Sequence, residues 1–212
     1  MFTGLVQATG GIVSVARLEA GVHIEIDARA LAPRVIAVGD SIAVSGVCLT
    51  ATSVADGHFG ADVSCETLSR TSGLDRCRCV NLETSLALGD KLGGHLVSGH
   101  VDGIGSVLRC APAGESVELA VLAPADLARF LAVKGSVCVD GVSLTINRVQ
   151  DHGGTGDAGA RGCEISINLI PHTVAVTTLK DLVAGSQVNL EIDLIARYVG
   201  RMLEAATGNP GA

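Results

Sequence analysis

Short runs of alternating apolar and polar residues occur along most of this chain. In the first quarter they cover residues 11–15, 23–26, 41–44 and 49–54, and glycine or aspartate lies between most of them. Because successive side chains of a strand point to opposite faces, such alternation is typical of strands with one buried face. The intervening glycine and aspartate residues are typical of turns. The pattern therefore predicts many short β-strands.

Three stretches show a helical pattern instead. Residues 28–38 and 123–133 are predicted to form short helices. In residues 194–206 apolar side chains recur at four-residue steps, from Leu194 to Ala206. This spacing predicts an amphipathic helix, which either caps the chain or binds the same helix in other subunits.

The chain repeats itself when it is shifted by 95 residues. Residues 1–50 then share 16 identities with residues 96–145. Farther along, residues 80–83 match residues 188–191 at a larger offset, and the additional residues lie mainly at 152–162, a stretch rich in glycine. Since self-similarity at a fixed offset is the signature of a duplicated unit, we infer a tandem duplication.

Each unit carries many short strands in little space, which favours a small closed barrel, because closure removes exposed strand edges. The predicted organisation is a first barrel at residues 1–95, a second at 96–193, and a terminal helix and tail at 194–212.

Composition narrows the functions that such a protein can have. Hydrophobic residues make up 48% and charged residues 17%, which excludes a disordered chain. The net charge of −7 argues against nucleic-acid binding. There is no Trp, and the few aromatic residues disfavour ligand stacking on side chains. The start of the chain lacks the basic residues of a signal peptide, and the uncharged run at 41–55 is too short to span a bilayer, so we predict a cytoplasmic protein without membrane contact.

Several features that resemble metal or cofactor motifs are weak. The seven Cys residues form no CxxC pair, and the close pair in residues 76–79 has no second pair at zinc spacing. His95 and His100 are five residues apart in a strand-like stretch, which points them to opposite faces. Residues 154–159 match G-x-G-x-x-G, but a strand-like segment follows, so a hairpin tip is predicted. We expect no metal and no cofactor.

The paired segments at residues 46–50 and 141–145 carry the most informative difference between the two units. Alternate residues share one face of a strand, so Cys48 and Thr50 point the same way. The same faces carry a thiol in one unit and the Ser143 hydroxyl in the other. The difference indicates either two related pockets with different tasks or a small polar packing layer beside a glycine.

Two further residues are candidates by context. His100 lies in a glycine-rich stretch, residues 93–103, where the backbone can approach a ligand closely, and an imidazole there can move a proton near neutral pH. The alternative is a loop histidine satisfied by the backbone. Lys134 precedes Gly135 between a predicted helix and a strand, where a solvated charge is the alternative.

These segments, in this order, resemble the riboflavin synthase family, trimeric enzymes built from two lumazine-binding barrels. The resemblance implies an all-β fold of two six-stranded antiparallel Greek-key barrels with a C-terminal helix. The resemblance spans nearly the whole chain. The matching pieces are residues 1–4, 46–50, 66–68, 93–103, 134–136, 140–145, 169–173 and 188–193.

The resemblance also implies a reaction. Two molecules of 6,7-dimethyl-8-ribityllumazine exchange a four-carbon unit, one becomes riboflavin and the other 5-amino-6-ribitylaminouracil, without cofactor or metal. A homotrimer is implied, with an association with lumazine synthase as a further partner. Holding two copies of one substrate face to face supplies much of the acceleration.

The resemblance assigns two sites and four residues for proton transfer and polarisation. The four residues for proton transfer and polarisation are Cys48, His100, Ser143 and Asp193, with Ser41 and Thr145 as second choices. Ser41 belongs to the substrate-binding residues, and Lys134 reaches in from a neighbouring subunit. One site is lined by Cys48, Leu49, Thr50, Asp62, Val63, Ser64, Cys65, Glu66, Thr67, Gly99, His100 and Val101. The other is lined by Gly4, Leu5, Val6, Ser143, Leu144, Thr145, Ile170, Pro171, His172, Thr173, Val174 and Ala175.

Some positions depart from the family pattern. Ser45 stands where asparagine is usual, the loop at residues 76–79 is shorter, and the insertion at 152–162 is long. A related carrier that binds one fluorescent lumazine without turnover is the main alternative to an enzyme. The third possible function is that of a structural double barrel that binds no ligand.

Overall fold

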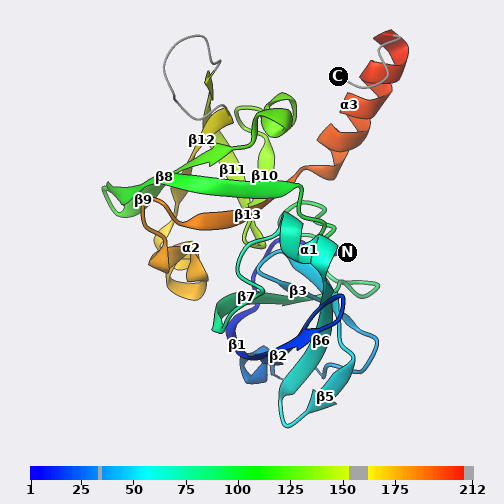
Figure 1. The fold of residues 1–212 in the computed structure, drawn as a ribbon. Helices are drawn as coiled ribbons and strands as arrows, with labels where there is room; N and C mark the ends of the chain where they lie inside the picture. Colours follow the sequence, from blue (N-terminus) through cyan, green and yellow to red (C-terminus); the bar gives the residue numbers. More distant parts are fainter. Residues whose placement is uncertain (33–34, 153–161, 208–212) are drawn as a thin grey trace.

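The computed structural model describes residues 1–32, 35–152 and 162–207. Figure 1 shows two β-rich units, one above the other in that view, with a helix projecting from the second. The first unit contains the 3₁₀ helix η1 (Arg29–Leu31), the helix α1 (Cys65–Arg70), and the strands β1 (Ala8–Leu18), β2 (Gly21–Asp27), β3 (Ser41–Val44), β4 (Val47–Thr50), β5 (Ser53–Ala55), β6 (His58–Ser64) and β7 (Arg78–Thr84).

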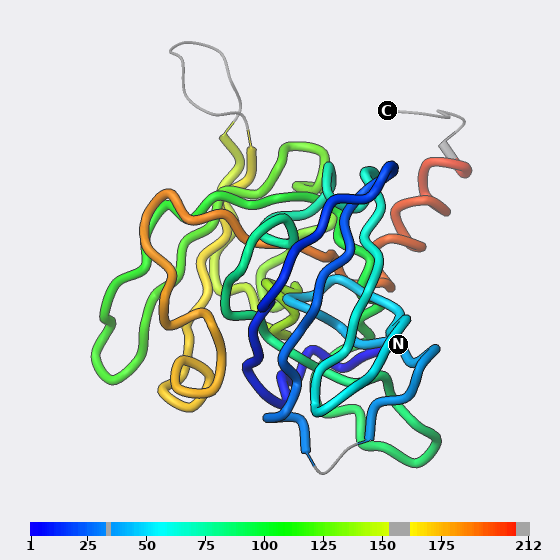
Figure 2. Tube along the Cα trace, turned by 60° about the horizontal axis from the view of Figure 1, so that its bottom comes forward, coloured from blue at the N-terminus to red at the C-terminus, as the bar shows by residue number. Residues whose placement is uncertain are grey.

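The second unit repeats this order of elements, and Figure 2 traces the chain through one unit before it enters the other. Its helices are η2 (Ala125–Phe130), α2 (Pro171–Val176) and η3 (Thr178–Asp181), and its strands are β8 (Gly103–Ala113), β9 (Ser116–Ala123), β10 (Ser136–Val139), β11 (Val142–His152), β12 (Gly162–Leu169) and β13 (Gln187–Ile192). The helix α3 (Leu194–Thr207) follows. The predicted β fold and the predicted C-terminal helix are confirmed.

The second unit is a closed antiparallel barrel with strand order β10-β11-β12-β9-β8-β13. The connection from β9 to β10 crosses two neighbouring strands, which is a Greek-key arrangement. The first unit is a seven-stranded sheet of order β4-β3-β7-β1-β2-β6-β5. Its end strands β4 and β5 follow each other along the chain and together correspond to β11, so both units have the same cyclic order. The predicted strand at residues 49–54 is thus divided between β4 and β5.

The predicted helices at residues 28–38 and 123–133 are wrong in type and extent, because the described residues of these stretches form only the 3₁₀ helices η1 and η2. In the first unit Ala32 precedes a proline and adopts φ −55° and ψ 142°. The proline ring disfavours a helical conformation in the preceding residue. In the second unit Pro124 itself is extended, and a residue of β-type conformation, Leu131, ends the helix.

Each unit has its own core, built mainly of β-branched and aliphatic side chains. Ile24, Ile42 and Leu82 are fully buried in the first core, and Leu119 and Ile165 in the second. A third, smaller cluster lies between the units and contains Phe2, Ala43, Val97 and Cys138. Phe2 and Val97, at equivalent positions of the repeat, pair with each other in an antiparallel bridge. The starts of the two units therefore meet at the interface.

Two tight turns meet backbone to backbone at this interface. Ser45-Gly46 joins β3 to β4 and Asp140-Gly141 joins β10 to β11, with positive φ at all four residues. Positive φ at both central residues is typical of type I′ hairpin turns, which favour Asp-Gly and Asn-Gly. A Cβ on Gly46 would lie 2.7 Å from the Gly141 backbone nitrogen, and one on Gly141 2.8 Å from that of Gly46. Glycine at both positions lets the units touch.

Two equivalent asparagines fasten each unit to the turn of the other. The Asn81 side-chain amide donates to the Asp140 carbonyl oxygen at 2.8 Å. The Asn189 amide donates to the Ser45 carbonyl oxygen at 3.0 Å. Within each unit, the backbone N–H of the asparagine donates to the side chain of the turn residue, Ser45 Oγ or Asp140 Oδ1. Ser45 thus fulfils the same contact as Asp140 without a charge.

Burial raises the pKa of Asp140 to about 6, and its Oδ2 atom has no partner in the part of the chain that the structure describes. Between about pH 4 and pH 6, Asp140 therefore carries a proton in the folded chain but has lost it in the unfolded chain. Because the folded state binds the extra proton, the free energy of unfolding decreases as the pH rises through this range. Asp140→Asn removes the titration. In urea unfolding from about pH 4 to pH 7, the variant should gain on the order of 3 kcal/mol relative to wild type. A stability difference that does not change with pH would contradict this.

Candidate functional site

A hollow of about 190 Å3 lies beside Cys48 on the outer face of the first unit. It lies where β4, the helix α1 and the start of the second unit come together. The lining residues are Val47, Cys48, Glu66, Thr67, Arg70, Thr71, Gly99, His100 and Val101. The two units therefore build this hollow together.

The alternation of β4 explains how Cys48 reaches the hollow. Leu49 is buried in the barrel core, whereas the half-buried Cys48 points outward. The Cys48 backbone N–H donates to the Gly99 carbonyl oxygen at 2.8 Å. Gly99 has a φ of 78°, and a Cβ there would lie 2.6 Å from the Cys48 Cβ. Only glycine lets the second unit's first segment approach Cys48 this closely.

A buried carboxylate holds that segment in place. Glu191 accepts hydrogen bonds from the Ser98 backbone N–H at 2.7 Å, the Ser98 hydroxyl at 2.5 Å and the Gly99 backbone N–H at 2.9 Å. Burial raises the pKa of Glu191, and these donors oppose that shift. Glu191 therefore positions residues of the hollow although it lies in the second unit.

The second unit contains the equivalent arrangement around Ser143. The Ser143 backbone N–H donates to the Gly4 carbonyl oxygen at 2.7 Å, and a Cβ on Gly4 would lie 2.7 Å from the Ser143 Cβ. Glu83 accepts from the Thr3 backbone N–H, the Thr3 hydroxyl and the Gly4 backbone N–H at 2.7, 2.7 and 3.0 Å. In each unit the residue two positions after the turn glycine, Cys48 or Ser143, is thus bonded to the first segment of the other unit.

The surroundings of Ser143 include a buried histidine. His95 lies 2.7 Å from the Ser143 hydroxyl through its Nδ1 atom. It is 9% exposed, and burial lowers its pKa, with the Asp193 carboxylate opposing. A Cβ on Gly94 would lie 3.1 Å from Ser143 Oγ, so glycine there leaves room beside the same hydroxyl. The sequence had indicated His95 only as an unsuitable metal ligand. Its place in the Gly-Gly-His stretch was the available signal.

Most of the other residues predicted for the Cys48 site lie close to it. Ser64 begins α1 by accepting the Thr67 backbone N–H at 3.1 Å, and this places Cys65, Glu66 and Thr67 on α1. Thr50 is exposed on the same face of β4 as Cys48. Asp62 is exposed and lies 2.6 Å from His23. The Val63 side chain is 2% exposed and belongs to the core.

The residues predicted for the Ser143 site gather less fully. Thr145 is exposed on the outer face of β11, whereas Leu144 is buried in the core. The segment after β12 forms α2, with Ile170 at its start. Of this group, Leu5, Ile170, Pro171, His172 and Ala175 are exposed, and Val6, Thr173 and Val174 are partly buried.

Three predicted residues lie outside both groups. Ser41 lines a separate hollow of about 430 Å3 with Asp40 and Ile42. Lys134 is exposed in the turn before β10, with a φ of 68°. Asp193 begins α3, since its carboxylate accepts the Ile195 backbone N–H at 2.9 Å.

A partly buried ion pair joins the His100 segment to α3. Asp102 accepts both terminal nitrogens of Arg197 at 2.7 and 2.9 Å, and the Ile192 backbone N–H at 2.9 Å. Asp102 follows His100 by two residues, so the position of α3 and that of the hollow are coupled.

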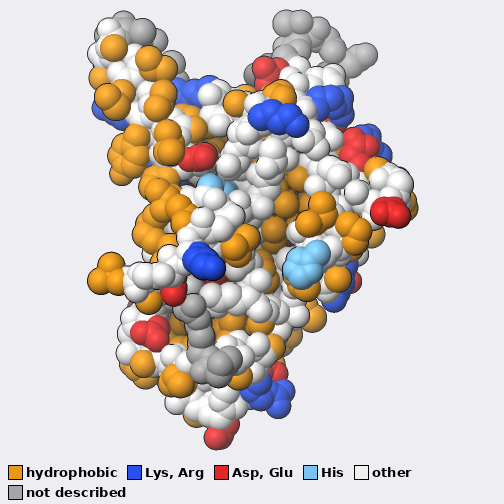
Figure 3. Space-filling model, turned by 180° about the vertical axis from the view of Figure 1, so that it is seen from behind, with side chains coloured by type: hydrophobic (Ala, Val, Ile, Leu, Met, Phe, Trp, Pro, Cys, Tyr) orange, Lys and Arg blue, Asp and Glu red, His pale blue; other side chains and the backbone are white. Residues whose placement is uncertain are grey.

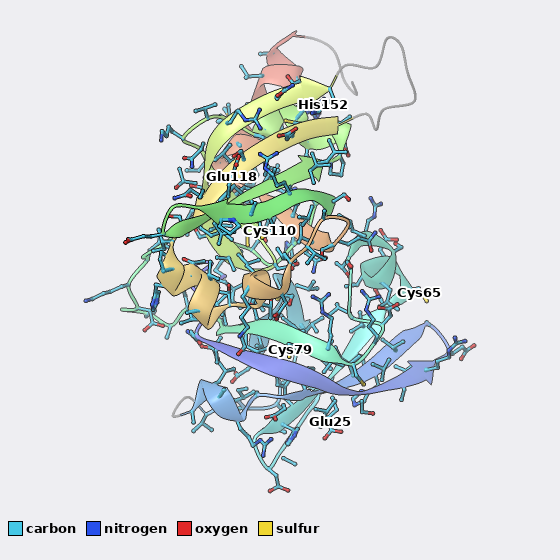
Figure 4. All side chains as sticks on the ribbon, turned by 90° about the vertical axis from the view of Figure 1, so that its left-hand side faces the viewer. Glu25, Cys65, Cys79, Cys110, Glu118 and His152 are labelled. Carbon is cyan, nitrogen blue, oxygen red and sulfur yellow. The ribbon has the colours of Figure 1, made fainter. Side chains whose placement is uncertain are left out.

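Among the described residues, no three His, Cys, Asp or Glu side chains gather as a metal site. Figure 4 shows Cys65, Cys79 and Cys110 on separate elements, at a distance from one another. The same residues include no helix long and apolar enough to cross a membrane. The insertion and its G-x-G-x-x-G motif at 154–159 lie outside the described residues.

Comparison with known proteins gives matches over nearly the whole chain. The family model of the lumazine binding domain matches residues 3–85 and again residues 98–193. The riboflavin synthase of Mycobacterium tuberculosis is 42% identical, covering 97% of this chain and 100% of that protein. The riboflavin synthase of Brucella abortus is 40% identical, covering 96% and 98%.

Solved structures agree on the fold. LumP complexed with riboflavin matches with a TM-score of 0.76 and 24% identity, covering 91% of this chain and 99% of that one. LumP complexed with 6,7-dimethyl-8-(1'-D-ribityl) lumazine matches with a TM-score of 0.74 and 22% identity over the same shares.

Proposed function

This chain belongs to the riboflavin synthase family, a family of transferases, and from that premise we propose the reaction that it catalyses. Two molecules of 6,7-dimethyl-8-ribityllumazine bind, one to each kind of pocket. A four-carbon unit passes from one to the other, which becomes riboflavin, and the donor becomes 5-amino-6-ribitylaminouracil.

The crossed pairing of the two units is the observation that supports this proposal most. The Cys48 backbone forms a hydrogen bond with the first segment of the second unit. The Ser143 backbone forms one with the first segment of the first unit. A reaction between two copies of one substrate needs two similar pockets that treat them differently. Duplication supplies the similarity, and the exchange of thiol for hydroxyl supplies the difference.

The chemistry assigns tasks to these side chains. The acceptor molecule must lose a proton from its C7 methyl group, and the donor must accept a nucleophile at C7. Cys48 and His100 line the same hollow, so one is placed to activate the nucleophile and the other to move a proton. Ser143 polarises the molecule in the second pocket. Asp193 lies at the start of α3, outside this group, and its proposed part is electrostatic, because its carboxylate opposes the lowering of the pKa of His95.

A homotrimer formed through α3 completes the proposal. Ile195, Tyr198 and Met202 are 66%, 63% and 72% exposed. Figure 3 shows orange side chains gathered over this helix at the upper left. An apolar helix face of this kind is typical of a subunit interface. The Cys48 pocket of one subunit would then face the Ser143 pocket of its neighbour, with Lys134 reaching across. Association with lumazine synthase and a cytoplasmic location stay predictions.

Turnover separates the enzyme from a carrier. When the purified chain is mixed with the ribityllumazine alone, riboflavin absorbance should appear and continue to increase well beyond one equivalent of protein. A stable fluorescent complex without riboflavin would make the chain a carrier. Unchanged lumazine fluorescence would mean that the barrels bind no such ligand.

Cys48→Ser should lower turnover more than it lowers ligand binding. A serine hydroxyl fills nearly the same space, but it is a much weaker acid than a thiol, so a proton-transfer step is slowed by roughly 10²-fold while the pocket keeps its shape. The kcat for riboflavin formation and the Kd for riboflavin would be compared.

Cys77→Ser is the matched control, because Cys77 is an exposed thiol away from the hollow. Its turnover should equal that of wild type. If Cys48→Ser keeps the wild-type kcat, Cys48 only lines the pocket.

A further inference from the structure

His95 makes the surroundings of Ser143 chemically unlike those of Cys48. Its Nδ1 atom lies 2.7 Å from Ser143 Oγ, and the imidazole is almost fully buried. Its Nε2 atom is buried as well, with no hydrogen-bond partner among the described residues. A buried polar atom without a hydrogen-bond partner costs free energy, so the contacts of the two nitrogens determine which of them carries the proton.

One tautomer fits these contacts better than the other. Burial lowers the pKa of His95 and so favours the neutral ring, which has one donor and one acceptor nitrogen. A proton on Nε2 would leave a buried N–H unpaired. A proton on Nδ1 donates to Ser143 and leaves only a lone pair unpaired, and orphaned N–H groups are the rarer of the two in proteins.

This donation determines the direction of the Ser143 hydroxyl. The Ser143 backbone N–H is already bonded to Gly4, so the hydroxyl is the residue's remaining donor. Because its oxygen accepts from His95, its own proton must point to another group. A Cβ on Gly94 would lie 3.0 Å from Ser143 Cβ and 3.1 Å from Oγ, so glycine at this position keeps the space beside the hydroxyl free. Accepting a hydrogen bond also polarises the O–H bond and makes it a stronger donor.

We propose that His95 is a positioning residue, which holds the Ser143 hydroxyl as a hydrogen-bond donor toward a carbonyl oxygen or ring nitrogen of the heterocycle in the second pocket. The inference rests on the proposed function and deepens it, because it names the group that makes the duplicated pockets unequal. Cys48 has a thiol at the equivalent position, a weaker donor.

Two substitutions at His95 separate this role from packing. His95→Leu has a similar volume but removes the hydrogen bond. His95→Asn keeps an amide nitrogen near the place of Nδ1. We expect His95→Leu to lower kcat about tenfold, the usual effect of one hydrogen bond, and His95→Asn to retain most of the activity.

The Ser143→Ala background shows whether His95 acts through Ser143. If it does, adding His95→Leu to Ser143→Ala lowers kcat no further, because contacting residues that act as a unit are not additive. An equal loss in both backgrounds, or wild-type kcat in His95→Leu, would overturn the proposal. If His95→Leu does not fold, His95→Gln replaces it, since its amide lies nearer the place of Nε2. His95→Gln activity equal to that of His95→Asn would then overturn it.

Ligand titration keeps this inference separate from the proposed function. If wild type forms no riboflavin, the proposed function fails, and riboflavin binding then tests His95. His95→Leu should weaken one class of site severalfold and leave the other unchanged, as Ser143→Ala does. Equal weakening of both classes, or of neither, would overturn the positioning role.

Discussion

Replacing Tyr198 and Met202 by glutamate is expected to abolish riboflavin formation while the barrels stay folded. Both side chains lie on the exposed apolar face of α3, at 63% and 72% exposure. Two charges there would prevent subunits from packing along this face. Each Cys48 pocket then lacks the Ser143 pocket of a neighbouring subunit. The enzyme no longer holds two substrates together, so the rate of riboflavin formation should fall by about 10²-fold or more. Light scattering and riboflavin formation measure the two effects.

Ala113→Glu is the control, because it introduces the same charge at the exposed tip of the β8–β9 hairpin, away from α3. It should remain trimeric and active. Urea unfolding of the double variant should show intact barrels, since neither residue belongs to a core cluster. The α3 interface is refuted if wild type is a monomer, or if the double variant is a fully active monomer.

Gly141→Ala is expected to give the largest loss of stability. A methyl group there would lie 2.8 Å from the Gly46 backbone nitrogen, and backbone on both sides leaves no flexible side chain to give way. Gly141 also has a φ of 82°, where an alanine costs roughly 1–2 kcal/mol. Because the clash adds to this cost, the free energy of unfolding should fall by about 3 kcal/mol or more.

Gly114→Ala separates the two costs. Gly114 has a φ of 66° at a hairpin tip, with nothing within 4 Å of the place that an alanine methyl group would take. Its alanine variant has only the conformational cost. Urea unfolding should therefore place Gly141→Ala well below Gly114→Ala. Equal losses would mean that the two turns do not press against each other.

The duplicated hairpins were predictable, because their signals are local. Asp140-Gly141 has the residue types that type I′ turns favour, Gly46 is the equivalent glycine of the first unit, and alternating strands flank both. The helix at residues 194–206 was predictable for the same reason. The helices at 28–38 and 123–133 were overextended, because their apolar content outweighed the proline in each stretch.

The contacts that hold Cys48 and Ser143 in place were much harder to predict. The match of residues 80–83 to 188–191 revealed the repeat but gave Glu83 and Glu191 no role. Each accepts donors from a segment about 80 to 90 residues away, and no sequence pattern reports such a distance. His95 was missed similarly, because its partner Ser143 lies 48 residues away. The family resemblance identified Cys48 and Ser143 together with Gly99 and Gly4, which bond them. It gave no role to Glu191, Glu83 or His95.

The most direct test of the two-pocket reaction is a labelling experiment with one substrate. Unlabelled 6,7-dimethyl-8-ribityllumazine is mixed with the same compound carrying ¹³C in its four transferable carbons, and riboflavin is analysed by mass spectrometry. Transfer between two bound molecules predicts riboflavin labelled in neither, in one or in both of its four-carbon units. Riboflavin without the singly labelled class, or a bound lumazine that is never converted, would contradict it.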